Sequence, residues 1–314
     1  MEKLPAEAVS AEQAGLTLAA LLRARLPGVS WSRVKSLIDG RRVAVRGELC
    51  RDPARRLKEG DVVELLARPL PPPRSPEDIT IRHLDEHVVV VEKPAGMNTV
   101  RHPAELQWKE SRKELSPTLQ DLVPHGIAQR TGSRGPRLRV VHRLDKETSG
   151  LLVFARTVAA ESALGKQFHA HTVVRRYLAI VLGQPQSGTL RSTLVRDRGD
   201  GRRGSGEGGK LAVTHVEVLE DLGTHSLVRC RLETGRTHQI RIHLSEQGHP
   251  VAGDPVYHLR PDGIETPDPS GAPRLMLHAT ELGFKHPITG ETLHWEMGLP
   301  PDMQAILSRL RKNA

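Results

Sequence analysis

The sequence predicts an α+β protein in which a small basic unit precedes a larger domain with a mixed, largely antiparallel sheet and flanking helices. Three observations support this class. Prolines crowd residues 69–76, and such a stretch is extended and stiff, so it indicates a linker. Two helical and two strand patterns fit within residues 15–68, ahead of the linker. Across residues 77–314, strand and helix patterns alternate without a strict repeat, which favours an α+β domain.

The small unit is predicted to begin with two short helices. Apolar residues recur at helical spacing over residues 17–25 and again over residues 34–38. Ser30 or Ser32 would cap the second helix, because a serine side chain can accept a hydrogen bond from the first turn. Two short strands follow, at residues 43–45 and 62–65.

Basic residues concentrate in this small unit. Residues 15–68 contain 12 Lys+Arg against 6 Asp+Glu, whereas the whole chain has 46 against 37 and a formal net charge of +9. Such a balance indicates a polyanionic partner, with nucleic acid first. Two short helices followed by a basic hairpin resemble the small RNA-binding module named after small-subunit ribosomal protein four, and a solvated basic face of an ordinary domain is the alternative. The resemblance implies RNA contacts from Arg33, Lys35, Arg41 and Arg42.

The larger domain is predicted from its apolar runs. Residues 158–169 and 302–311 have the spacing of amphipathic helices. Residues 101–137 are polar and broken by proline and glycine, so they are expected to form a surface insertion. Residues 196–210 contain six glycines and are expected to form a second insertion, which either orders on RNA or stays disordered. The strand candidates are residues 88–92, 138–141, 151–155, 173–182, 211–219 and 227–232.

Several kinds of site are missing from the sequence. No run approaches the roughly 20 apolar residues of a membrane helix, and aromatic residues are only 3%, too few for a broad single-strand stacking surface. His169 and His171 have no third ligand at matching spacing, so no metal site is expected. No phosphate-binding loop, dinucleotide fingerprint or HExxH motif occurs. Cys50 and Cys230 are too few for a disulfide framework, and the expected compartment is the reducing cytoplasm.

One segment, HRLDKETSGL at residues 142–151, concentrates groups that could do chemistry. It places acidic, basic and hydroxyl side chains between two apolar strands, where functional sites are often built. Taken alone, Asp145 could be a nucleophile, a base or a residue that only shapes a turn.

The same segment resembles the signature of the RluA-type pseudouridine synthases, His-Arg-Leu-Asp followed by Thr-Ser-Gly-Leu. Further stretches match blocks of that family in the same order along residues 80–300. One departure is Arg101, which separates Val100 from His102 where relatives often read Val-His-Pro. The matching stretches are EKPAG at 92–96, RYLA at 176–179, TGRTHQIR at 234–241, GHPVAGD at 248–254 and LHA at 277–279.

The resemblance implies the pseudouridine synthase fold and the isomerisation of uridine in RNA. Because the product is an isomer of the substrate, neither a redox cofactor nor an energy donor is expected. Large-subunit ribosomal RNA is the expected substrate, with transfer RNA second, and a monomer is the expected state. The alternatives are a non-catalytic RNA-binding or ribosome-assembly protein on the same scaffold and an aspartate-dependent enzyme that acts on small nucleosides.

The resemblance also implies roles for single residues. Asp145 acts at the glycosidic bond, and Arg241 keeps it ionised through a bidentate ion pair. Tyr177 lies against the target base and takes the ring proton in the last step. Arg143 fills the space that the flipped base leaves, or holds a phosphate. His142 hydrogen-bonds RNA or supports the turn. The expected phosphate contacts are Lys93, Arg175, Arg176, Lys210 and Arg236.

The segment around Arg241 fits two kinds of secondary structure. Apolar and polar residues alternate over residues 240–244, as they do in a strand. Thr237 as a cap and Gly248 as a stop favour a helix instead. We expect the helix, because it matches the family and presents Arg241 near a turn.

Overall fold

The chain folds as two compact units. One is formed by Met1–Pro73 with Lys109–Ser116, and the other by Arg74–Trp108 with Pro117–Ala314. The division between Pro73 and Arg74 falls inside the predicted proline-rich linker, of which residues 70 and 71 lie outside the described residues. The computed structural model describes residues 4–69, 72–199, 201–258 and 267–313.

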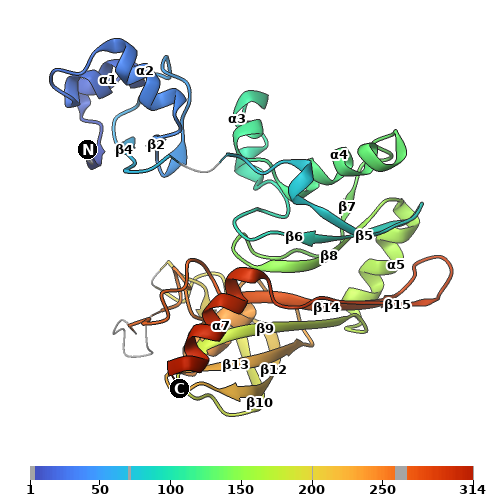
Figure 1. The fold of residues 1–314 in the computed structure, drawn as a ribbon. Coiled ribbons are helices and arrows are strands. Elements are labelled where there is room, and N and C mark those ends of the chain that lie inside the picture. Colours follow the sequence, from blue (N-terminus) through green and yellow to red (C-terminus); the bar gives the residue numbers. More distant parts are fainter. Residues whose placement is uncertain (1–3, 70–71, 200, 259–266, 314) are drawn as a thin grey trace. The chain divides into compact units, whose positions relative to one another are not determined.

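The small unit packs two helices with a four-stranded antiparallel sheet of order β1-β4-β2-β3 (Figure 1). Both predicted helices are confirmed, and each begins at a hydroxyl cap. The Ala20 N–H donates to Thr17 Oγ1 at 3.2 Å, and the Arg33 N–H donates to Ser30 Oγ at 3.2 Å. The elements are β1 (Leu4–Ala8), α1 (Leu18–Arg25), α2 (Trp31–Asp39), β2 (Val43–Val45), β3 (Glu48–Leu49) and β4 (Val62–Leu65).

The small unit starts earlier than the predicted residue 15. Strand β1 pairs with β4, and Val9 after it is buried at 2% exposure in the core of the unit. The sequence does not reveal this strand, because Leu4–Ala8 lacks a run of β-branched or alternating apolar residues.

The larger unit is built on one mixed sheet of order β11-β10-β12-β13-β9-β14-β8-β6-β5, with β15 on β14 and β7 on β8. The pair β14 and β8 is parallel, and the other pairs of this sheet in the described residues are antiparallel. The predicted α+β class is therefore confirmed. The strands are β5 (Thr80–Leu84), β6 (Val88–Lys93), β7 (Arg139–Val140), β8 (Ser149–Ala155), β9 (Val174–Leu182), β10 (Gly188–Val195), β11 (Gly204–Ser205), β12 (Lys210–Asp221), β13 (His225–Leu232), β14 (Leu277–Lys285) and β15 (Thr292–Glu296).

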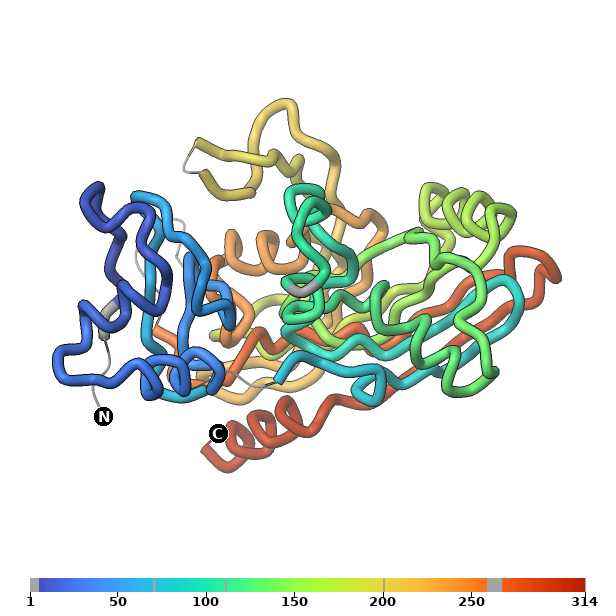
Figure 2. The backbone as a smooth tube through the Cα atoms, turned by 90° about the horizontal axis from the view of Figure 1, so that it is seen from above, coloured from blue at the N-terminus to red at the C-terminus, as the bar shows by residue number. Residues whose placement is uncertain are grey.

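Helices cover both faces of this sheet. Figure 2 shows α6 (Gln239–Glu246) and α7 (Pro301–Asn313) on opposite sides of the strands. The predicted helix at 158–169 is confirmed as α5 (Val158–His169), which Thr157 caps by accepting the Ala160 N–H. Among the described residues, no helix is long and apolar enough to cross a bilayer.

The prediction that residues 101–137 form a surface insertion is wrong for much of that stretch. It contains α3 (Glu110–Leu115) and α4 (Leu119–Thr131), and α4 buries apolar side chains in the main core. Thr118 and Asp121 form a capping box at its start, and Gly132 ends it in the left-handed conformation at φ 75°. Pro124 lies inside the helix, although proline cannot donate the main-chain hydrogen bond of that position.

Residues 196–210 are partly ordered by pairing. Strand β11 pairs with the end of β10, and Ser205 donates its N–H and its hydroxyl to Glu246 at 2.8 and 2.6 Å. Lys210 belongs to β12. Residue 200 lies outside the described residues.

Candidate active site

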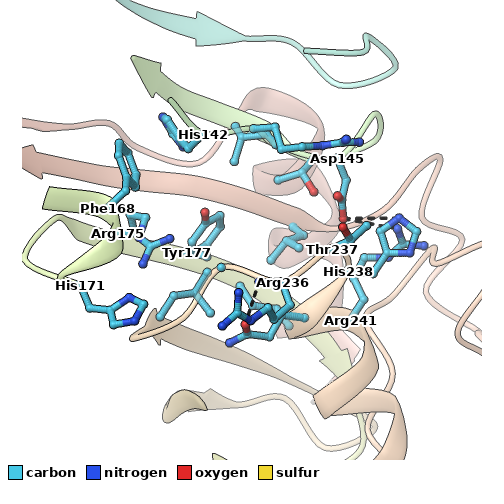
Figure 3. A pocket seen from close by; sticks show the side chains of 18 of the residues that line it. His142, Asp145, Phe168, His171, Arg175, Tyr177, Arg236, Thr237, His238 and Arg241 are labelled. Carbon is cyan, nitrogen blue, oxygen red and sulfur yellow. Dashed lines mark hydrogen bonds and ion pairs between the residues drawn. The ribbon is translucent and has the colours of Figure 1, made fainter. Parts of the chain in front are cut away.

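The predicted catalytic segment forms the rim of a pocket of about 430 Å³. Its lining includes Asp145 from the turn before β8, Phe168 from α5, Tyr177 from β9 and Arg241 from α6. Figure 3 shows these side chains around a common space. The structure therefore brings together the three residues to which the sequence assigned the chemistry, although they are separated by up to 96 positions (145 to 241).

The turn ends where β8 meets β14. Gly150 pairs in parallel with Ala279 and has φ +119°, a conformation that L side chains rarely adopt. A Cβ atom at Gly150 would lie 2.1 Å from the carbonyl oxygen of Ala279. Only glycine therefore lets the two strands approach here, and this approach anchors the end of the turn.

Two buried side chains hold the turn on either side of Asp145. The Lys93 ammonium donates to the carbonyl of Lys146 at 3.0 Å and to two further carbonyls at 2.9 and 2.8 Å. The Thr99 hydroxyl donates to the carbonyl of Leu144 at 2.8 Å and accepts the N–H of the same residue at 3.1 Å. The main chain before and after Asp145 is thereby fixed.

The prediction that Lys93 contacts phosphate is wrong. Its side chain is 1% exposed, and its three donors all serve main-chain carbonyls. Burial lowers the pKa of Lys93 to about 7, although the nearby carboxylates of Glu147 and Asp145 raise it. Lys93 supports the catalytic turn from behind.

Arg241 contacts Asp145 but is not its bidentate partner, which corrects the prediction. Arg241 Nη1 lies 3.6 Å from Asp145 Oδ2. Arg241 Nε and Nη2 instead donate to the two carboxylate oxygens of Asp254 at 2.7 and 2.8 Å. Burial disfavours ionisation of Asp254, yet the hydrogen bonds and charge of Arg241 hold its pKa below the usual range. Asp254 thus fixes two of the guanidinium nitrogens and leaves the third for Asp145.

The predicted helix around Arg241 is confirmed, but its predicted cap is not. His238, in the left-handed conformation at φ 59°, is the cap residue, and its side chain makes no capping hydrogen bond. Residues 239–245 are all buried, so the apolar alternation does not mark a strand face. Gly248 follows the helix with φ +82°, as the predicted stop requires.

Tyr177 lies in the pocket wall at 7% exposure. Burial raises the pKa of Tyr177, against the charge of Arg175, which lowers it. Arg175 shares this face of β9, because side chains two positions apart in a strand point the same way. Arg176 points elsewhere and donates to both oxygens of Glu281 at 2.7 and 2.6 Å. Of the two predicted phosphate contacts, Arg175 lines the pocket and Arg176 does not.

Comparison with known proteins identifies the family. Residues 87–246 match the model described as RNA pseudouridylate synthase. The chain is 38% identical to ribosomal large subunit pseudouridine synthase D of Zymomonas mobilis subsp. mobilis, over 98% of both chains. The chain belongs to the RNA pseudouridylate synthase family.

Other relatives of this synthase agree. Ribosomal large subunit pseudouridine synthase D of Neisseria meningitidis serogroup B is 39% identical over 98% of the chain and 82% of its own length. Among solved structures, human RNA pseudouridylate synthase domain containing 4 is 26% identical with a TM-score of 0.59, covering 74% of the chain and 92% of that structure. The predicted RluA-type resemblance and enzyme class are confirmed, whereas the relation of the small unit to ribosomal protein four stays a prediction.

Other predicted RNA contacts of the synthase fall into two groups. Arg143 and Arg236 line the pocket and are exposed. His142 also lines the pocket, but its Nε2 accepts the Val153 N–H at 3.1 Å, so this nitrogen serves the turn. Burial, and then the charge of Arg175, lower the pKa of His142 to about 3, and its ring is therefore neutral.

In the small unit, Arg33 and Lys35 are exposed on α2 and remain predicted RNA contacts. Arg41 is half-buried with φ 60°. Arg42 is 8% exposed, and it donates to the carbonyls of Leu66 and Ala67 at 3.0 and 3.3 Å. The prediction that Arg42 offers a surface contact is wrong, because its guanidinium ties the main chain after β4.

Sequence reasoning missed three residues beside the site. His238 Nε2 lies 3.9 Å from Asp145 Oδ2, and its Nδ1 lies 2.8 Å from the hydroxyl of Tyr257. Asp254 holds Arg241, as described above, and accepts the Tyr257 N–H at 3.0 Å. His238 and Asp254 belong to the matched stretches, but a linear motif does not say which members touch. In the described residues no cluster of three His, Cys, Asp or Glu side chains is placed to hold a metal ion.

Proposed function

We propose that this synthase isomerises uridine to pseudouridine in large-subunit ribosomal RNA, with Asp145 as its catalytic carboxylate. The observation that carries the proposal is the position of Asp145 in the pocket at 17% exposure, with Arg241 Nη1 at 3.6 Å. Support for the substrate comes from the relatives named for the large ribosomal subunit, one of which matches along 98% of both chains.

The reaction conserves all atoms and electrons. The bond from C1′ of ribose to N1 of uracil breaks, the uracil turns, and C1′ bonds to C5. The proton on C5 is then lost and N1 gains one, so the product is an isomer of uridine. Asp145 attacks the sugar, attacks the ring or removes a sugar proton, and each of these routes needs it ionised. The guanidinium of Arg241, whose Nη1 lies 3.6 Å from Asp145 Oδ2, pairs with this carboxylate and orients it.

Tyr177 supplies a ring face for the target base. Stacking of a base on an aromatic side chain is worth about 1–3 kcal/mol. Because burial raises the pKa of Tyr177, its hydroxyl stays protonated at neutral pH and is available as a hydrogen-bond donor to the base. We therefore propose that Tyr177 stacks on the target base and orients it, in preference to a role in removing the C5 proton.

Base flipping and RNA recruitment involve residues at and beyond the pocket. A uridine in folded RNA must leave its stack to reach a carboxylate that is 17% exposed, at a cost of a few kcal/mol. Arg143, exposed and two residues before Asp145, is proposed to hold the distorted strand. Arg33 and Lys35 on α2 are proposed to recruit RNA through its phosphates. We propose that the synthase acts as a monomer, in the cytoplasm with its substrate.

The test is site-resolved pseudouridine mapping of ribosomal and transfer RNA from cells with and without this gene. An Asp145→Asn copy should fail to restore the lost site while its protein still binds RNA. An Asp221→Asn copy, altered at the exposed end of β12, should restore it. Turnover above about one per cent of wild type in Asp145→Asn would reject the catalytic assignment, since loss of a key group costs a factor of 100 or more. Lost sites confined to transfer RNA would move the substrate assignment there.

A further inference from the structure

The pocket has a second end that the proposed chemistry does not use. In the view of Figure 3, Asp145, His238 and Arg241 lie to one side of Tyr177, and Phe168, His171 and Arg175 lie to the other. We call the end formed by Phe168, His171 and Arg175 the distal end. Its residues come from the end of α5, the turn after it, and β9.

Arg175 carries a buried charge with little compensation. Its side chain is 7% exposed, yet no carboxylate of the described residues forms an ion pair with it. Nη2 donates to the carbonyl of Glu233 at 3.2 Å, and Nε is buried without a hydrogen-bond partner in the described part of the chain. By contrast, Arg241 in the same pocket is neutralised by Asp254. An uncompensated buried charge is costly, so this arginine indicates a ligand that supplies the missing negative charge.

The surroundings of Arg175 are positive and leave it room. Arg236 lines the same pocket, and the pKa of His171 is lowered by burial and by the charges of Arg175 and Arg236. A Cβ atom at Gly235 would lie 2.8 Å from Arg175 Nη1, so the glycine leaves space for the guanidinium. The ring of Phe168 lies 5.5 Å from the Arg175 Cζ and forms an apolar wall beside it.

We propose that Arg175 binds an RNA phosphodiester group adjacent to the flipped uridine, and that the distal end is the anion subsite of the pocket. This inference rests on the proposed RNA substrate. A planar guanidinium forms two parallel hydrogen bonds with a phosphate, and the phosphate neutralises its charge. A carbonyl oxygen of uracil would satisfy Nε but would leave the buried charge uncompensated. The subsite would hold the nucleotide backbone in place while the uracil ring is free to turn on the Asp145 side.

The proposal predicts opposite effects on stability and on binding. Arg175→Met removes an uncompensated buried charge, so the unfolding midpoint of the RNA-free protein should stay the same or rise. RNA affinity should fall ten- to hundredfold, the range for a lost charge-assisted hydrogen bond, and Arg175→Lys should recover part of it. The matched control is Arg176→Met on the opposite face of β9. It breaks the pair with Glu281, so it should lower the midpoint and leave RNA affinity within twofold.

The ligand chemistry is tested on a synthetic RNA that contains the mapped uridine. A neutral methylphosphonate replaces first the 5′ and then the 3′ phosphate of that uridine, and binding is measured in the Asp145→Asn background. A methylphosphonate at one of the two positions should weaken RNA binding by the Asp145→Asn protein tenfold or more. The same RNA should bind the protein that also carries Arg175→Met no more weakly than unmodified RNA does. Equal losses of affinity in the proteins with and without Arg175→Met, or no loss at either phosphate, would overturn the anion subsite. Pseudouridine formation by the wild type would still uphold the proposed function in that case. A wild type that modifies no RNA would reject the proposed function instead.

Discussion

Replacing Asp254 with asparagine should show how far the contact between Arg241 and Asp145 depends on the Asp254 carboxylate. The Asp254 carboxylate is fully buried and accepts four hydrogen bonds, two from Arg241 and one each from the N–H groups of Val256 and Tyr257. Asp254→Asn keeps the size of the side chain but removes its charge and points an amide group at the guanidinium. Arg241, whose side chain is 5% exposed, then loses its two close carboxylate contacts and keeps only the 3.6 Å contact with Asp145.

The expected cost is about 3–5 kcal/mol of unfolding free energy for the larger unit, the range for breaking one side of a buried ion pair. Arg241→Met should cost a similar amount, because it strands the carboxylate of Asp254. The double variant carries neither charge, so its loss should be smaller than the sum of the single losses by about 2 kcal/mol. Activity should fall about 100-fold in Asp254→Asn, since Arg241 no longer points Nη1 at Asp145.

The assay is urea unfolding followed by tryptophan fluorescence in a Trp31→Phe background. Trp31 is 51% exposed and belongs to the small unit, so its removal leaves Trp108 and Trp295 to report on the larger unit. Pseudouridine formation is measured in parallel on the mapped RNA. A coupling energy below about 0.5 kcal/mol would mean that the two sites act independently, and it would refute the argument that Asp254 positions Arg241.

Three further predictions concern the catalytic turn. Lys93→Met leaves three carbonyls without their donor and should lower single-turnover rates about 100-fold at unchanged RNA affinity; an equal loss of affinity would contradict a positioning role. Gly150→Ala forces a Cβ atom to 2.1 Å from Ala279 and should destabilise the larger unit by more than 2 kcal/mol of strain and lost pairing, measured by urea unfolding; a normal midpoint would refute the close approach. Burial lowers the pKa of His278 from 6.5 to about 4, so between these values the folded state binds fewer protons than the unfolded chain and loses stability as pH falls. Between pH 7.5 and 5, wild type should therefore lose about 2 kcal/mol more than His278→Gln, and parallel losses would contradict a buried neutral His278.

Local pattern alone was enough to predict many elements of the fold. The amphipathic spacing of residues 158–169 coincides with α5, and the β-branched run at 88–92 lies within β6. Apolar periodicity and hydroxyl caps are properties of a short stretch, so they can be recognised without the partner. Apolar periodicity could not distinguish a helix from a strand where all sides of an element are buried. The helix α6 is buried all round, and its alternation looked like a strand.

The resemblance of the ordered motifs to a known family also predicted the chemical kind of the site. Asp145, Tyr177 and Arg241 were chosen from ordered motifs, and the fold brings them to one pocket. What the sequence could not determine was which groups compensate which charges. Arg175 and Arg176 are adjacent and alike in the sequence. In the folded chain Arg176 is paired with Glu281, whereas Arg175 is buried in the pocket.

The tertiary structure decided the supporting contacts, because they join residues far apart in the chain. Lys93 is 53 residues from Lys146, and Thr99 is 45 residues from Leu144. Burial turned Lys93 from an expected phosphate contact into a main-chain anchor, and it made Asp254 the partner of Arg241. A local pattern records which side chains are apolar, basic or acidic. The cost of burying a polar group depends on the neighbours that folding supplies, so only the folded chain could assign these partners.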